Sequence, residues 1–257
     1  MKYYLKFLWI AVFCGILCIL GYSAGEDKFF ASEVISLFGM YGTSYFVQYL
    51  PDITHLFVPL LLFQMFFGTY IYHHFCTASI YFFSRYPKRN KWFFTETFKL
   101  YLFGCIYLFL MLISGTLVCS LFSKIVIDRK MWKLLFFYIC IYSLYLFVST
   151  FAINLLSILF NSNVAFIIVA GINSFFIAAF TIVGNFFAPE GVILQQYEWT
   201  IKINPFYYLI FGMHNNNTDY FISILLFFSM AVLLFICSYF VINKHDFIDS
   251  NREDSVK

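Results

Sequence analysis

The stretch LLFFYICIYSLYLFVSTFAINLLSILFNSNVAFIIVAGINSFFIAAFTIVGNFFAP, residues 134–189, decides the fold class, because no residue in it carries a formal charge. All 16 Lys+Arg and all 13 Asp+Glu of the 257-residue chain lie outside it. A helix crosses the apolar core of a bilayer with about 20 residues, so this stretch is long enough for two crossings. Asn161-Ser162-Asn163 is the only turn signal inside it and predicts a tight hairpin between the two helices.

Four shorter charge-free blocks each predict one further span: Phe7–Gly25, Ile53–Ser84, Leu100–Ser123 and Tyr220–Asn243. An ionised side chain at mid-membrane costs about 2.5–3.5 kcal/mol, so charges confined to the intervening segments indicate a bilayer as solvent. The sequence therefore predicts an all-α, polytopic membrane protein with a single transmembrane domain over residues 1–257. Its six helices are expected at about 4–22, 53–74, 99–122, 133–160, 164–186 and 221–242.

The composition agrees with this fold class. Hydrophobic residues make up 62% of the chain and charged residues 11%, with a mean hydropathy of +0.83, whereas soluble domains average about 25% charged residues. The net charge of +3 is too small to indicate nucleic acid as a partner. None of the seven cysteines forms a CxxC pair or a His-spaced cluster, so no metal site is predicted.

The distribution of Lys and Arg in the short connections predicts the orientation. The N-terminus and the connection after the second span are basic, whereas Ser23–Asp52 and the connection after the fifth span are acidic. Both termini are therefore expected in the cytoplasm, with the chain in a bacterial plasma membrane. The connection between spans three and four disagrees with this bias, since the orientation places it outside although it is basic: Lys124, Arg129, Lys130 and Lys133 against Asp128.

The predicted spans contain no formally charged residue in their interiors, which argues against an ion-coupled transporter, a proton pump or a membrane enzyme. No Walker lysine motif is present, so the chain is not expected to hydrolyse ATP itself. Gln64, Asn154 and Asn173 are the polar candidates for a translocation path. Hydrogen bonding between helices is the favoured interpretation of these side chains over contact with a substrate.

Two connections carry further information. Residues 80–98 mix basic and aromatic side chains, a composition that fits either a protein-docking surface or an anchor at the lipid headgroups. Residues 187–219 are semi-apolar, too short and interrupted to span, and are expected to lie in the interface or to re-enter the protein.

These features together resemble ABC-2-type transporter permeases (type V exporter-like architecture). Gly68-x-x-Ile71-Tyr72 and Ser84-Arg85-x-x-Lys88-Arg89-x-Lys91-Trp92 are similar to the small six-span permease subunits of Gram-positive bacteria linked to bacteriocin or lantibiotic export or immunity. Asn204-Pro205 before the last span and Asn243-Lys244-His245-Asp246 after it add to the resemblance. The long outer loop at 23–52 and the lack of a long amphipathic N-terminal helix depart from the family pattern.

The resemblance implies a permease subunit that pairs with a second permease, identical or homologous, and rests on a separate cytoplasmic P-loop ATPase holding ATP and Mg. The chain itself would need no cofactor, and membrane lipid would be its other contact. The path would run between subunits along spans two and five, and the uncharged, aromatic spans suit an amphipathic peptide or lipid-like cargo. The residues that the family pattern assigns to ATPase coupling are Tyr81, Phe82, Arg85, Lys88, Arg89, Lys91 and Trp92.

A non-transporting membrane scaffold or immunity protein, which binds a toxin or a sensor partner, is the alternative. A scaffold should tolerate charge reversal at Arg85 and Arg89 unless its partner docks there, whereas a permease should lose function while remaining folded in the membrane.

Overall fold

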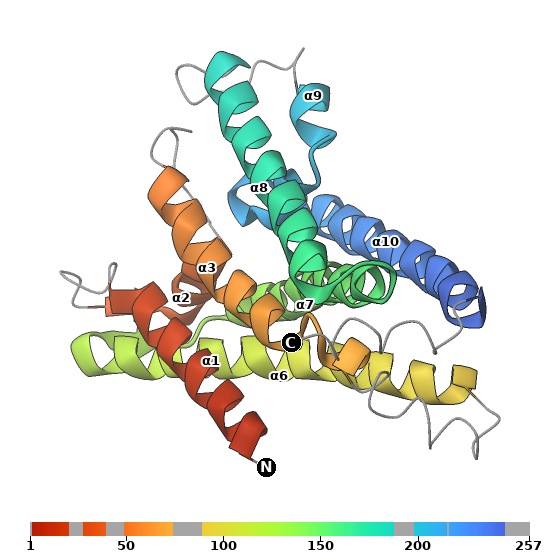
Figure 1. Ribbon diagram of the computed structural model, residues 1–257. Helices are drawn as coiled ribbons and strands as arrows, with labels where there is room; N and C mark the ends of the chain where they lie inside the picture. Colours follow the sequence, from red (N-terminus) through yellow and green to blue (C-terminus); the bar gives the residue numbers. More distant parts are fainter. Residues whose placement is uncertain are drawn as a thin grey trace.

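A computed structural model describes residues 2–20, 28–39, 49–73, 89–187, 198–214 and 216–244, and this part of the chain is predominantly helical (Figure 1). Its long helices are α1 (Lys2–Leu20), α3 (Tyr49–Phe67), α6 (Arg89–Phe122), α7 (Arg129–Leu159), α8 (Ser162–Phe187) and α10 (Asn217–Lys244). The short helices are α2 (Ala31–Phe38) and α9 (Glu198–Lys202), with 3₁₀ turns η3 (Pro205–Leu209) and η4 (Phe211–Met213).

Four helices are long and apolar enough to cross a membrane, as expected of a helical membrane protein: Lys91–Phe122, Arg129–Leu159, Ser162–Val183 and Asn217–Val241. In the first two predicted spans, the stretches of apolar helix with described side chains are shorter than these four: Leu8–Ile19 and Phe57–His73. The structure thus supports the prediction of a helical membrane protein, whereas the number of six spans stays a prediction.

The largely helical structure also contains a two-stranded sheet that the sequence did not predict. β1 (Lys28–Phe30) pairs in parallel with β2 (Lys124–Val126), with Phe29 opposite Ile125. Strands of three residues are too short to show the alternation of polar and apolar residues by which strands are predicted. The pairing joins the connection before α2 to the connection before α7, which lie far apart in the sequence.

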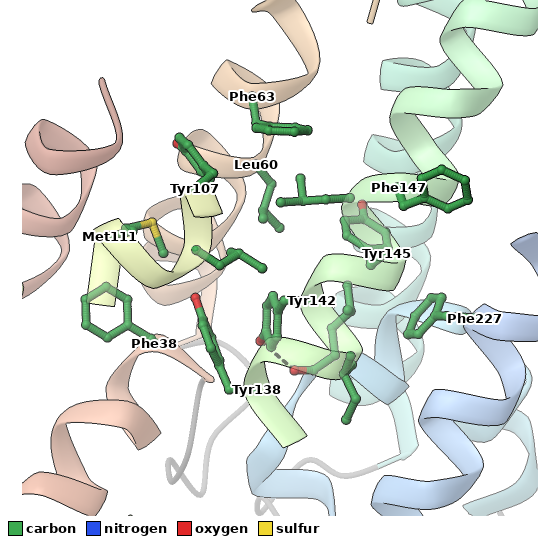
Figure 2. Close-up of a cluster of buried hydrophobic side chains, with 14 of the residues drawn as sticks. Phe38, Leu60, Phe63, Tyr107, Met111, Tyr138, Tyr142, Tyr145, Phe147 and Phe227 are labelled. Atoms are coloured by element: carbon green, nitrogen blue, oxygen red, sulfur yellow. Dashed lines mark hydrogen bonds between the residues drawn. The ribbon is translucent and has the colours of Figure 1, made fainter. Parts of the chain in front are cut away.

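Helix α7 is the centre of the bundle and packs against α2, α3, α6, α8 and α10 (Figure 1). In its most apolar window 61% of the residues are buried, against 22% for α8 and for α10. Tyr138, Tyr142 and Tyr145 follow one another along its buried side (Figure 2). The Tyr138 and Tyr142 rings stack at 4.5 Å, and the Tyr142 hydroxyl donates to the Leu209 carbonyl at 2.6 Å. The core is therefore aromatic, and the Tyr142 hydroxyl also binds η3 to α7.

Helices α1 and α6 pack closely through small residues. A methyl group added at Gly15 would collide with the Ser114 hydroxyl and the Met111 carbonyl. One added at Gly115 would collide with the Phe38 ring and lie 2.9 Å from Ile19. Small residues let backbones approach in membrane helix pairs, where van der Waals contact supplies most of the attraction, so this pair depends on glycine at both positions.

Candidate functional site

The predicted coupling residues fall mostly outside the described part of the chain. Tyr81, Phe82, Arg85 and Lys88 all do, and Arg89 begins α6 without a described side chain. In the first turn of α6 the Lys91 side chain is exposed, and Trp92 is half-buried against the core. The segment 80–98 is therefore described only from residue 89 onward.

The start of α6 is tied to the end of α3 by a buried carboxylate. The Glu96 side chain is only 7% exposed, accepts a hydrogen bond from the Tyr70 hydroxyl at 2.9 Å and pairs with Lys99 at 2.7 Å. Tyr70 belongs to the helical turn 70–73 that follows α3. The two ends of the connection 74–88 are thus linked directly to each other.

Gln64 and Asn154 lie in one interface, between α3 and α7, and both are buried. The Gln64 amide donates to the Ser149 hydroxyl at 2.9 Å. Asn154 Oδ1 accepts from the backbone N–H of Ile71 and Tyr72 at 2.8 and 3.2 Å, and its Nδ2 donates to the Phe67 carbonyl at 3.0 Å. Both side chains therefore hold helices together.

Asn173 differs from these two residues. It lies on α8 and shares no hydrogen bond with either of them. Its Nδ2 is buried without a partner among the described residues, as are Gln64 Oε1 and the Tyr138 hydroxyl. The carbon that a substitution would add at the neighbouring Gly171 meets nothing within 4 Å. This part of the apolar helix α8 thus has a polar side chain at Asn173 and open space beside Gly171.

A cleft of about 1010 Å³ opens where α6 ends and α7 and α10 begin. We call this end the outer end, after the predicted orientation, and the hollow the outer cleft. Its walls come from β1, α2, the first residues of α7 and the segment 214–220. The charged side chains that line it are Glu33, Asp128, Arg129, Lys130 and Lys133.

Both carboxylates of the outer cleft are used locally. Glu33 Oε2 accepts from the backbone N–H of Phe30 at 2.8 Å, and Asp128 Oδ1 accepts from that of Ser32 at 3.1 Å. Lys133 Nζ donates to the Asn217 side-chain carbonyl. Over the described residues the one ion pair is Lys99–Glu96, which is far along α6. Arg129 and Lys130 are therefore exposed cations without an acidic partner there.

His214 forms the buried floor of the outer cleft. Its Nδ1 lies 2.8 Å from the Ile210 carbonyl and its Nε2 lies 2.7 Å from the Ser223 hydroxyl. Because a carbonyl only accepts, Nδ1 carries a proton. The single proton of the Ser223 hydroxyl has two acceptors within reach, Nε2 of the neutral ring and the Asp219 carbonyl at 2.9 Å. The ring stacks on Tyr220 at 4.5 Å. Burial lowers the pKa of His214. The Ile210 carbonyl and the Asp219 carboxylate act to raise this pKa, but burial has the larger effect.

Residues 204–211 of the semi-apolar segment 187–219 are folded into the protein, whereas the Trp199 and Ile203 side chains are 63% and 71% exposed. Leu209, Ile210 and Phe211 are fully buried. Asn204 begins η3, with its Oδ1 accepting from the Phe206 N–H and its Nδ2 donating to the Phe176 carbonyl of α8 at 2.7 Å. The Phe211 N–H donates to the Gly39 carbonyl at 2.8 Å. The backbone of this segment is thus bonded inside the bundle.

In comparisons with protein-family models, curated proteins and solved structures, no match to this chain is found. Among the described residues no group of three or more His, Cys, Asp or Glu side chains is placed to hold a metal ion.

Sequence reasoning did not find the outer cleft. It treated Glu33, Asp128, Arg129 and Lys130 only as charges that report orientation, and it did not single out His214 or Tyr220. The available signal was the basic connection before α7, which disagreed with the charge bias of the other connections.

Proposed function

We propose that this chain is the membrane-spanning permease subunit of an ATP-binding cassette transporter. It exports or clears an amphipathic peptide or lipid-like substrate, and a separate P-loop ATPase supplies the energy. The observation that carries the proposal is the Tyr70–Glu96 hydrogen bond, because it joins the two helices that flank the basic and aromatic connection 74–88. A displacement of that connection by a partner would act on α3 and α6 together.

The length of α6 supports this role. Its 34 residues extend over about 51 Å at about 1.5 Å per residue, whereas the apolar core of a bilayer is about 30 Å thick. The first turns, with Lys91 and Trp92, therefore project beyond the apolar core on the side of the connection. A helix of this length can carry a movement at its inner end to the outer cleft.

The chemistry of the spans supports an external energy source. Glu96, the buried carboxylate of α6, lies near the inner end of that helix and is already paired with Lys99. Ion-coupled transport needs ionisable groups within the membrane, and the interiors of the predicted spans have no formal charge. In the proposal the path runs between two permease subunits, along the second and fifth predicted spans, and Asn173 is the polar side chain of α8 on that path.

Purification of the tagged chain from native membranes in mild detergent, with mass spectrometry of the bound proteins, tests the proposal. A P-loop ATPase in near-stoichiometric amount is expected, and Arg85→Glu/Arg89→Glu should remove it while the chain stays folded in the membrane. Arg129→Glu/Lys130→Glu makes the same change of charge at the outer end and should leave the ATPase bound. An ATPase-free preparation, or equal retention by both variants, would favour the non-transporting scaffold.

A further inference from the structure

Over the described residues, three cations and two carboxylates line the outer cleft, and none of these cations is in an ion pair. Glu33 and Asp128 accept backbone hydrogen bonds from Phe30 and Ser32, and neither lies within ion-pair distance of Arg129 or Lys130. Lys133 is bonded to the neutral side chain of Asn217. Two exposed cations at adjacent positions therefore border a cleft large enough for a small organic group.

The predicted orientation of the chain in the membrane makes these cations unexpected at the outer end. Short outer connections generally carry few Lys and Arg, whereas the connection before α7 and its first turn carry four between Lys124 and Lys133. The parallel pairing of β1 with β2 places this connection at the same end of the bundle as the acidic first loop. A ligand with negative charge would account for cations at this end.

The rim of the outer cleft has a second character, which is apolar. Phe30 and Leu37 line the cleft, and Phe30 is 49% exposed; Ile127 and Trp132, which neighbour the cations in the sequence but do not line the cleft, are 74% and 64% exposed. Tryptophan and basic residues together are typical of the headgroup region of a bilayer, where the ring meets the acyl boundary and the cation meets phosphate. A free inorganic anion would have no use for these apolar side chains.

We propose that the outer cleft binds the headgroup of an anionic phospholipid, with its phosphate held by Arg129 and Lys130 and an acyl chain lying against Phe30. Arginine suits this role because its planar guanidinium can donate two parallel hydrogen bonds to phosphate oxygens. Complementarity of charge and an adjoining apolar rim favour a lipid over an acidic peptide. The proposal concerns the chain alone and does not depend on an ATPase partner.

Native mass spectrometry of the full-length chain in neutral detergent, titrated with phosphatidylglycerol or phosphatidylcholine, tests this site. We expect phosphatidylglycerol to bind preferentially, and Arg129→Gln/Lys130→Gln to weaken its binding at least tenfold. Arg89→Gln/Lys91→Gln removes one Arg and one Lys charge at the other end of α6 and should change binding by less than twofold. Equal effects of the two double variants, or equal binding of the two lipids, would overturn the proposal.

Two further arms identify the ligand and guard against a folding defect. Glu33→Gln keeps an acceptor for the Phe30 N–H but removes a negative charge from the cleft, so it should tighten phosphatidylglycerol binding severalfold; no change or weaker binding would contradict the site. Inorganic phosphate at 10 mM (roughly the level of many buffers) should not displace the lipid, because surface ion pairs are weak without the apolar contacts. Displacement by phosphate would identify the ligand as a small anion, and displacement by a polyglutamate peptide would identify it as an acidic peptide. Either result would overturn the proposal of a lipid.

Discussion

The side chain of Asn154 on α7 holds the backbone of Ile71, accepting its N–H at 2.8 Å where the helix of the second predicted span is interrupted. α3 ends at Phe67, and a turn at Gly68 and Thr69 separates it from the helical turn 70–73. Such a break leaves backbone groups without acceptors inside the helix. Asn154 supplies the missing partner from a different helix, so α7 fixes the inner end of α3 and the position of Tyr70.

Asn154→Leu should destabilise the protein by about 1–3 kcal/mol or more, because buried backbone groups at 67, 71 and 72 would lose their partners. Thermal unfolding in detergent measures the effect. Asn173→Leu is the matched control: its Nδ2 has no partner in the described structure, so the substitution should leave the unfolding temperature unchanged or raise it. Similar losses at both positions would contradict the hydrogen-bonding role of Asn154.

Gly15→Ala should destabilise the α1–α6 pair, since the added methyl group would overlap the Ser114 hydroxyl and the Met111 carbonyl. Overpacking of this kind costs about 1–3 kcal/mol and should appear as a lower unfolding temperature or as aggregation on gel filtration. Gly171→Ala adds the same group where nothing lies within 4 Å and should be neutral or slightly stabilising. A neutral Gly15→Ala would show that the two helices separate easily.

Stability should fall as the pH drops from 7.5 towards 5.5, because burial lowers the pKa of His214 in the folded state. The unfolded chain then binds more protons than the folded chain below the usual His pKa of about 6.5, and stability is lost as the pH falls through that value. Unfolding temperatures across this range measure the trend. His214→Gln should flatten it, and an equally steep trend in that variant would assign the effect to other groups.

Tyr70→Phe should separate assembly from transport. It removes the hydroxyl that donates to Glu96 but keeps the ring that packs against Phe67 and Phe103. In the proposed transporter the ATPase should stay bound, while ATP-dependent transport, or resistance to the exported compound, should fall severalfold. Tyr101→Phe is the control. It removes a hydroxyl of α6 that is hydrogen-bonded to Ser143 of α7. Full activity of Tyr70→Phe would exclude this hydrogen bond from coupling.

Sequence patterns were most informative where one physical effect dominates. Exclusion of charge from the bilayer made residues 134–189 recognisable as membrane helices. The break inside that stretch follows from local chemistry: α7 ends at Leu159, α8 begins at Ser162, and the Asn161 side chain accepts from the Val164 N–H at 2.8 Å. An Asn near a helix start does this without any distant partner.

Features that depend on distant contacts could not be predicted. The pairing of Phe29 with Ile125 joins two short segments that show no strand pattern. The buried stacking of His214 on Tyr220 depends on how η4 turns back onto α10. The use of Asn154 as a partner for a broken helix requires knowing which helices touch. In each case the residue type was visible, but its neighbour was set by tertiary packing.

Site-specific photo-crosslinking in native membranes tests the proposed transporter function most directly. A photoreactive phenylalanine analogue would replace Trp92 at the start of α6 or Trp132 near the start of α7, which lie at opposite ends of the bundle. The account predicts a crosslink to a P-loop ATPase from position 92 and none from position 132. No ATPase adduct from position 92, or the same adducts from both positions, would contradict the assignment of this chain as an ATP-driven permease.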